Sequence, residues 1–207
     1  MHRPLASCLA ALVATACTAA TPRVQTGEDA EKSPDGLHKV DGVAVGTLYM
    51  RPDYFFGSYE SFFLKPTSVD YARGARMLEL EEEDELIRIF ETVARQAIGG
   101  SGRKEVYDPG PCVAVVQLAL VDIDVGAEAG AVGATTLVME VRDGVTNEAL
   151  LRYGQRRRLM GTDLETAFRR YSLRFQQDFN RSLPVEVSPG IVSCQERAGE
   201  GAPPAGP

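Results

Sequence analysis

The sequence is poor in the residue on which most hydrolytic and metal-dependent catalysis relies. Its 207 residues include two histidines and no tryptophan. Histidine supplies most general bases and many metal ligands near neutral pH. A Ser-His-Asp or Cys-His site would therefore have to be built on His38, and no GxSxG or HExxH pattern accompanies it. The sequence predicts no serine, cysteine or zinc hydrolase chemistry, no metal site and no other cofactor.

The chain also lacks a hydrophobic run long enough to span a membrane. Residues 5–17, LASCLAALVATAC, form an uncharged apolar run near the N-terminus, short of the ~20 residues that a bilayer requires. This run of small apolar residues follows Arg3 and ends on a cysteine, which is typical of a removable export signal. We interpret residues 1–16 as a signal peptide.

Cys17 gives this signal the form of a bacterial lipoprotein signal, in which the thiol after the cleavage point is diacylated, for example with palmitate. Thr15 and Ala16 suit the two preceding positions, whereas Ala14 stands where leucine is usual. Ordinary cleavage, which would release a secreted or periplasmic protein, stays open as the alternative. Because Thr18 rather than aspartate follows Cys17, we expect anchoring in the outer membrane, facing the periplasm. Several acyl chains would make such an anchor effectively permanent.

The remaining cysteines are interpreted by compartment. Cys8 leaves with the signal, so Cys112 and Cys194 remain in an oxidising space where a disulfide can persist. A bridge closing a loop of about 80 residues would stabilise the fold by roughly 4 to 5 kcal/mol in the chain-entropy model. The sequence leaves open whether the two Cα atoms come close enough.

Charge and length restrict the partners and the domain number. The net charge is −7 and becomes one unit more negative without Arg3. An acidic protein is a poor match for nucleic acid, and we expect none as a partner. The length suits one domain. We expect it over residues 36–194, between a disordered lipidated tether at 17–35 and a disordered tail at 195–207, both polar and rich in Pro or Gly.

Hydrophobic periodicity predicts two amphipathic helices. The first, about residues 80–98, has an apolar stripe, an acidic first turn that suits the helix dipole, and a glycine stop. The second covers DLETAFRRYSLRFQQDFNRSL, residues 163–183, with Asp163 as its cap or first-turn acid. The stripes are Leu86, Ile87, Phe90, Val93, Ala94, Ala97 and Ile98 in the first, and Leu164, Phe168, Tyr171, Phe175, Phe179 and Leu183 in the second.

Runs of β-branched and apolar residues predict the strands. Residues 61–71 indicate an edge strand interrupted at Pro66, and 112–125 a central strand. Residues 134–142 and 148–159 flank the turn DGVTN and should pair as a hairpin. The order β-α-β-β-β-α predicts an α+β fold: a two-layer sandwich of a mostly antiparallel sheet with both helices on one face.

Several patterns invite a functional interpretation, each with a plainer structural one that we favour. The acidic residues 81–85 could act as a glycosidase-like carboxylate pair, or simply begin a helix. GGSGRK, residues 99–104, lacks phosphate-loop spacing and should cap that helix. Asp122, Asp124 and Gly126 are a fragment of a calcium loop without its terminal Glu.

Aromatic and basic residues form local groups as well. The aromatic group would form a binding patch if it were exposed, although we favour a role in the core. Its members are Tyr54, Phe55, Phe56 and Tyr59. The arginines could bind anionic lipid headgroups or an acidic partner. We favour the alternative that they protect a sheet edge from aggregation. They are Arg152, Arg156, Arg157, Arg158, Arg169, Arg170 and Arg174.

The succession of these pieces resembles the bacterial lipoprotein family known as domain of unknown function 3313. The resemblance rests on DGL at 35–37, LYMRPDYFFGSYESFFLKP at 48–66, the EEEDELIRIFETVARQAI helix, PGPCVAVVQLALVDI, ATTLVMEVRDGVTNEALLR and LETAFRRYSLRFQQDF. It departs from relatives in the hairpin turn, where Asn147 replaces a glycine but tolerates the same conformation. It implies a lipid-anchored envelope protein of small α/β type and brings no catalytic residues.

These observations favour a non-enzymatic cell-envelope lipoprotein whose domain binds or helps assemble another envelope component, with a protein partner of unknown identity. Two alternatives stay open. One is an exported carboxylate-based hydrolase or carbohydrate-binding protein. The other is an accessory subunit of an envelope transporter.

Overall fold

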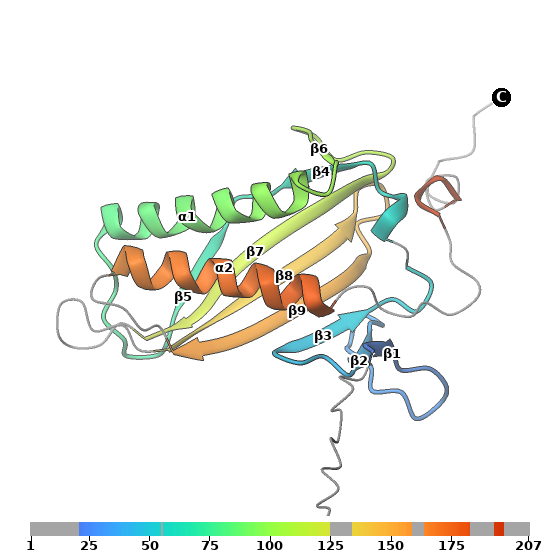
Figure 1. The fold of residues 1–207 in the computed structure, drawn as a ribbon, viewed down its shortest axis with the longest axis horizontal. Helices are drawn as coiled ribbons and strands as arrows, with labels where there is room; N and C mark the ends of the chain where they lie inside the picture. Colours follow the sequence, from blue (N-terminus) through green and yellow to red (C-terminus); the bar gives the residue numbers. More distant parts are fainter. Residues whose placement is uncertain (1–20, 55, 125–133, 159–163, 183–192, 197–207) are drawn as a thin grey trace, which may run out of the picture.

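The computed structural model describes residues 21–54, 56–124, 134–158, 164–182 and 193–196. In this part of the chain, nine strands form one sheet in the order β1-β2-β3-β9-β8-β7-β4-β6, with β5 beside β7. Two long helices, α1 and α2, lie side by side on the same face of the sheet (Figure 1). The expected two-layer α+β sandwich is confirmed.

The centre of the sheet is an antiparallel meander of β7 (Val113–Ile123), β8 (Ala134–Asp143) and β9 (Ala149–Arg158). Burial alternates along β8, as expected where one sheet face packs against helices. The turn between β8 and β9 is built by Asp143, whose Oδ1 accepts hydrogen bonds of 2.8 Å from the amides of Val145 and Thr146. Asn147 completes it at φ 57°, the left-handed conformation that asparagine tolerates.

One flank of the meander is parallel. β4 (Ser61–Leu64) and β5 (Ser68–Tyr71) both run parallel to β7, and β6 (Lys104–Glu105) pairs with β4 at the outer edge. The single interrupted strand expected at 61–71 is therefore two strands with Pro66 between them. Proline has no N–H to donate, so the ladder breaks there.

The other flank begins closer to the N-terminus than the sequence indicated. β1 (Arg23–Val24), β2 (His38–Asp41) and β3 (Thr47–Met50) continue the antiparallel sheet beyond β9. The prediction of a disordered tether at 17–35 is wrong for residues 21–35, while 17–20 lie outside the described residues. Polar composition concealed this order because turn residues supply it: the hydroxyl of Ser33 accepts the Leu37 amide at 3.0 Å.

The two helices match their expected ranges. α1 spans Leu80–Gly99 and α2 spans Leu164–Ser182. At the start of α1 the Glu79 amide donates to the Glu82 carboxylate at 3.2 Å, half of a capping box. Gly100 caps the other end, its amide donating to the carbonyl of Gln96 at 2.9 Å. Asp163, the expected cap of α2, lies outside the described residues. No helix in the described ranges has the length and hydropathy to cross a bilayer.

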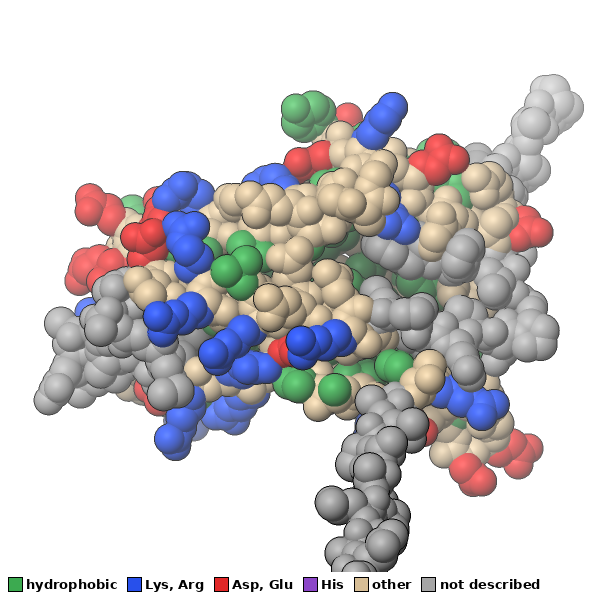
Figure 2. Space-filling model, in the orientation of Figure 1, with side chains coloured by type: hydrophobic (Ala, Val, Ile, Leu, Met, Phe, Trp, Pro, Cys, Tyr) green, Lys and Arg blue, Asp and Glu red, His purple; other side chains and the backbone are tan. Residues whose placement is uncertain are grey.

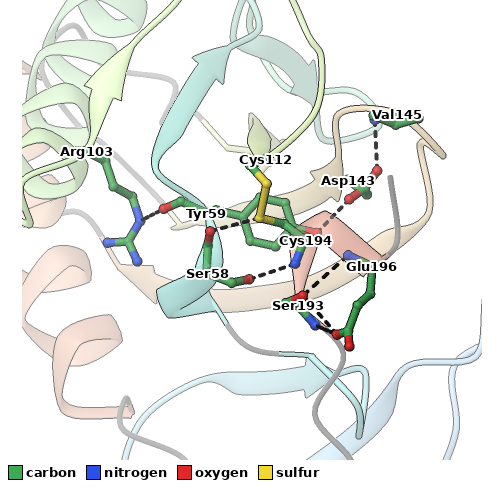
Figure 3. The surroundings of a disulfide bond; sticks show 9 residues. All are labelled: Ser58, Tyr59, Arg103, Cys112, Asp143, Val145, Ser193, Cys194 and Glu196. Atoms are coloured by element: carbon green, nitrogen blue, oxygen red, sulfur yellow. Dashed lines mark hydrogen bonds between the residues drawn. A yellow bond between two sulfur atoms is a disulfide. The ribbon is translucent and has the colours of Figure 1, made fainter. Parts of the chain in front are cut away.

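A disulfide joins Cys112, just before β7, to Cys194 in the described segment 193–196. The two Cα atoms are 5.0 Å apart across a sequence separation of 82 residues. Figure 3 shows the bridge beside Tyr59 and next to the short 3-10 helix η1 (Phe56–Ser58), whose Ser58 hydroxyl accepts the Cys194 amide at 3.2 Å. Residue 194 is thereby held beside the start of β7.

Candidate functional site

A cavity of about 200 Å³ lies between the two helices and the sheet. Figure 2 shows hydrophobic side chains in the hollow that separates the helices. Its floor comes from β7 and β8, and its walls from the later halves of α1 and α2. The apolar lining residues are Phe90, Val93, Ala94, Ala97, Ile98, Val116, Leu118, Leu137, Met139, Val141, Phe175 and Phe179.

Toward the earlier half of the helix pair, aromatic rings pack across the space between the two helices. The Phe90 ring of α1 packs edge-on against Phe168 and Tyr171 of α2, with centroids 5.7 and 5.9 Å apart. The Tyr171 hydroxyl, although buried, is satisfied: it donates to the Gln155 carbonyl at 2.7 Å and accepts the Leu137 amide at 3.0 Å. We call this half the closed end.

In the later half, which we call the open end, the rings of α2 turn away from α1. Phe175 and Phe179 pack on Tyr153 of β9, with centroids 5.0 and 5.5 Å apart. Opposite them α1 presents the small side chains of Ala94 and Ala97, which are only partly buried. Two methyl groups cannot fill the volume that the phenyl rings vacate, and the cavity is the result.

The polar lining residues are Ser101, Arg103, Gln176 and Asn180 at the rim of the open end, and Ser172, which is buried and donates to the Phe168 carbonyl at 2.9 Å. Arg103 is held in place, because its Nε donates to the Tyr59 carbonyl at 2.9 Å and its guanidinium to the Ser101 hydroxyl at 2.6 Å. Burial lowers the pKa of Arg103 below its usual value, but an arginine stays charged at neutral pH. Neither carboxylates nor imidazoles are among the lining side chains.

This arrangement suits the binding of an apolar molecule. The lining offers dispersion contacts and excludes water, and the rim offers donors that could orient one polar end of a ligand. An engineered apolar cavity of about 150 Å³ in another protein stays dry and takes up benzene. The lined stretch covers residues 90–98 of α1, or roughly 12 Å of helix. The space therefore extends along about 12 Å of α1, enough for part of an aliphatic chain.

The aromatic patch considered from the sequence is not an exposed surface where the structure describes it. Tyr54 and Tyr59 are 0% and 2% exposed, with ring centroids 5.7 Å apart. The Tyr59 hydroxyl donates to the buried Asp143 carboxylate at 2.7 Å, which explains why this tyrosine can lie in the core. Phe55 lies outside the described residues, as does the side chain of Phe56. Tyr54 and Tyr59 therefore have the core role that the sequence favoured, and the alternative of an exposed patch containing them is wrong.

The acidic residues 81–85 serve the start of α1. Glu82 accepts the Glu79 amide, and Glu83 accepts the Tyr71 hydroxyl at 2.5 Å. Burial, followed by that hydrogen bond, raises the pKa of Tyr71 to about 12. Glu85 pairs with Arg88 one turn on. These contacts join the first turn of α1 to β5.

The other sequence patterns have structural roles where they are described. His38 contacts the Gln25 carbonyl through Nδ1 at 2.8 Å. Gly99, Gly100 and Gly102 end α1 and turn the chain, with Gly102 at φ 86°. Asp122 and Asp124 line a shallow polar hollow with Arg73 and Arg156, while Gly126 lies outside the described residues. Within the described ranges no three His, Cys, Asp or Glu side chains gather as a metal site would require.

The arginine groups divide into paired and outward-facing members. Arg152 binds Asp35 and Glu140, and Arg157 binds Asp178, which also accepts Gln155 Nε2 at 2.8 Å. Arg169 pairs with Glu165 at 2.9 Å. Arg156, Arg158, Arg170 and Arg174 are exposed and form no ion pair with a described residue.

Sequence reasoning missed the cavity, although one signal for it was present. The apolar stripe of α1 narrows to alanine at 94 and 97 while the facing stripe of α2 keeps phenylalanine at 175 and 179. Whether such a mismatch is filled depends on ring rotamers and helix spacing. Periodicity contains neither.

No family model and no curated protein sequence matches this chain. Solved structures show a distant likeness. A point variant of the PelC dodecamer from Paraburkholderia phytofirmans is 11% identical with a TM-score of 0.38, covering 60% of this chain and 89% of that one. A second PelC dodecamer from this organism is 9% identical with a TM-score of 0.34, covering 54% of this chain and 81% of that one. A Xanthomonas campestris protein of the family domain of unknown function 330 is 13% identical with a TM-score of 0.35, covering 58% of this chain and 81% of that one. Likeness at this level carries no argument about function.

Proposed function

We propose that this chain is a cell-envelope lipoprotein, anchored through Cys17, whose domain is a non-enzymatic module that binds an apolar ligand with one polar end. The cavity between α1, α2 and the sheet carries the proposal. It is enclosed on three sides by apolar side chains, and its rim bears hydrogen-bond donors but no catalytic acid or base.

The disulfide supports export. Disulfides persist in oxidising compartments and are rare in the cytosol. The Cys112–Cys194 bridge ties the segment 193–196 to the sheet, so the folded domain includes a covalent bond that an oxidising compartment favours. Placement in the outer membrane, a protein partner in the envelope and membership of the family inferred from the sequence remain parts of the proposal.

Ligand binding is tested by filling the cavity. The probe is N-phenyl-1-naphthylamine, an uncharged fluorophore that brightens in apolar surroundings, added to the full chain carrying Cys17→Ser so that no detergent is needed. Ala97→Leu adds three carbons to the cavity wall and should weaken saturable binding at least tenfold. An unbranched fatty acid should displace the probe.

The matched control is Gln96→Leu, which adds an apolar side chain to the exposed side of the same turn of α1. It should leave binding unchanged. Equal binding by the two variants, or no saturable binding by the parent chain, would contradict ligand binding at this site.

Anchoring is tested separately. Globomycin treatment or Cys17→Ala should block processing, so that the protein retains residues 1–16 and its mass rises accordingly. Mass spectrometry of the mature protein should find Cys17 as the first residue, carrying acyl chains. An unmodified full-length chain in the cytosol would refute the anchor and leave the cavity experiment unaffected.

A further inference from the structure

The outward face of α2 is basic although the protein is acidic. Its exposed residues include four arginines, Arg169, Arg170, Arg174 and Arg181, which together we call the arginine face. Leu173 lies among them and is 46% exposed. Figure 2 shows blue side chains gathered over this helix, whereas red ones gather near the start of α1.

The two helices differ in how their arginines are satisfied. On α1, Arg88 pairs with Glu85, and Arg95 pairs with Glu91 and Glu105. On α2 the two acids are already engaged: Glu165 pairs with Arg169, and Asp178 is directed inward to Gln155 and Arg157. Arg170 and Arg174 have no acidic partner among the described residues, and Arg181 is 3.9 Å from Asp178. Within the arginine face, the charges of Arg170 and Arg174 are therefore available to an external anion.

The topology places this face near the N-terminal attachment point. The described chain begins beside β1, and the sheet order β1-β2-β3-β9 leads from there to the strand that α2 contacts. Acidic α1 contacts β4 and β6 on the opposite half of the sheet. Figure 1 shows the same division, with β1, β2 and β3 on the side of α2.

The segment between the proposed lipid anchor at Cys17 and the folded domain is short; this step rests on the proposed function. Thr21, the first described residue, is four positions after Cys17, so an extended chain allows at most ~14 Å between them. Electrostatic screening lengths are about 8 to 10 Å at physiological ionic strength. A domain held this closely lies within reach of the charge on the bilayer surface.

We propose that the arginine face of α2 docks on the anionic phospholipid headgroups of the membrane that holds the anchor. Guanidinium groups bind phosphate oxygens in a bidentate manner. Leu173 is placed to enter the headgroup region between the arginines. Docking would turn the acidic helix α1 away from the bilayer and lay α2, one wall of the cavity, against it.

The test uses the full chain with Cys17→Ser, so that lipid attachment cannot contribute, and measures cosedimentation with two kinds of vesicle. The vesicles are either pure phosphatidylcholine or contain phosphatidylglycerol. Residues 1–16 include Arg3 and the N-terminal amine, so they add the same attraction for anionic vesicles to the parent chain and to every variant, and the comparison between variants isolates the contribution of α2. The parent chain should bind the anionic vesicles more tightly. The preference should fall with added salt.

The double variant Arg170→Gln/Arg174→Gln should reduce affinity for anionic vesicles roughly 25-fold, since each arginine near an anionic surface contributes about fivefold. The control Arg88→Gln/Arg95→Gln removes the same charge from α1 and should retain the preference. Equal losses in both variants would show a non-specific charge effect and overturn the proposal. So would a parent chain without preference, the result expected if an acidic protein is the true partner. Because the chain carries no lipid, a failed anchor at Cys17 would not affect this measurement.

Discussion

The closed and open ends of the helix pair are made of similar residues and have opposite properties. Each has phenylalanine on α2 facing an apolar stripe on α1. At the closed end Phe90 packs across the helix pair against Phe168 and Tyr171. At the open end Phe175 and Phe179 turn to Tyr153, and Ala94 and Ala97 leave a cavity. The direction of the aromatic rings, rather than the composition, distinguishes the closed end, where rings pack across the helix pair, from the open end, where the cavity lies.

The largest effect should come from the closed end. Phe90→Ala removes two ring contacts of a buried side chain and should cost about 3–5 kcal/mol of unfolding free energy. Phe179→Ala, at the open end, removes a partly exposed ring beside existing empty space and should cost less than half as much. Urea unfolding of both variants measures the difference. Equal losses would mean that the two ends are packed alike.

Removing the disulfide measures how much a covalent restraint near the open end contributes to the stability of the fold. Arg103 on the cavity rim donates to Tyr59, which lies next to the bridge (Figure 3). Replacing Cys112 and Cys194 with alanine should lower stability by about 2–5 kcal/mol. Reduction with dithiothreitol should destabilise the parent chain by a similar amount and leave the double variant unchanged. Sensitivity of that variant to the reductant would point to a different cause.

Asp143 offers a pH test of a buried group outside both ends. Burial raises the pKa of Asp143, but hydrogen bonds from the Thr146 amide, the Tyr59 hydroxyl and the Val145 amide outweigh it and hold the pKa below its usual value. A lowered native pKa stabilises the fold above the unfolded value of about 3.9, and this contribution is lost as pH falls through the native pKa.

Asp143→Asn should therefore cost about 1.5–3 kcal/mol at pH 7, the range for hydrogen bonds to a charged group. The gap between parent and variant should narrow as the pH is lowered from 5 to 2. Unfolding curves at several pH values measure it. A constant gap would show that the carboxylate charge is not what Tyr59 and the turn amides stabilise.

The smallest effect is expected on the arginine face. Arg170→Gln/Arg174→Gln removes two exposed charges with no ion-pair partner among the described residues, so stability should change by less than about 0.5 kcal/mol. Thermal unfolding checks this result. A larger loss would assign these arginines a structural role and weaken the vesicle experiment.

The sequence predicted elements accurately where a local pattern reports a local structure. The helix expected at 80–98 is Leu80–Gly99, and the strands expected at 134–142 and 148–159 are Ala134–Asp143 and Ala149–Arg158. Periods of 3.6 and 2 persist because each residue must face the core or the solvent. The sequence did not predict order at 21–35. Hydrogen bonds from distant residues, such as Arg152 to Asp35 at 2.6 Å, hold that polar segment.

By itself the sequence determined the α+β class, the positions of both helices and the central meander, because those depend on hydrophobic periodicity and turn chemistry. Only the tertiary structure decided that Tyr54 and Tyr59 are core residues, that β4 and β5 run parallel to β7, and that a cavity opens between α1 and α2. Each of these depends on which side chains meet across long separations. The directions of rings and strands in space are properties of the packed molecule, and a one-dimensional pattern does not contain them.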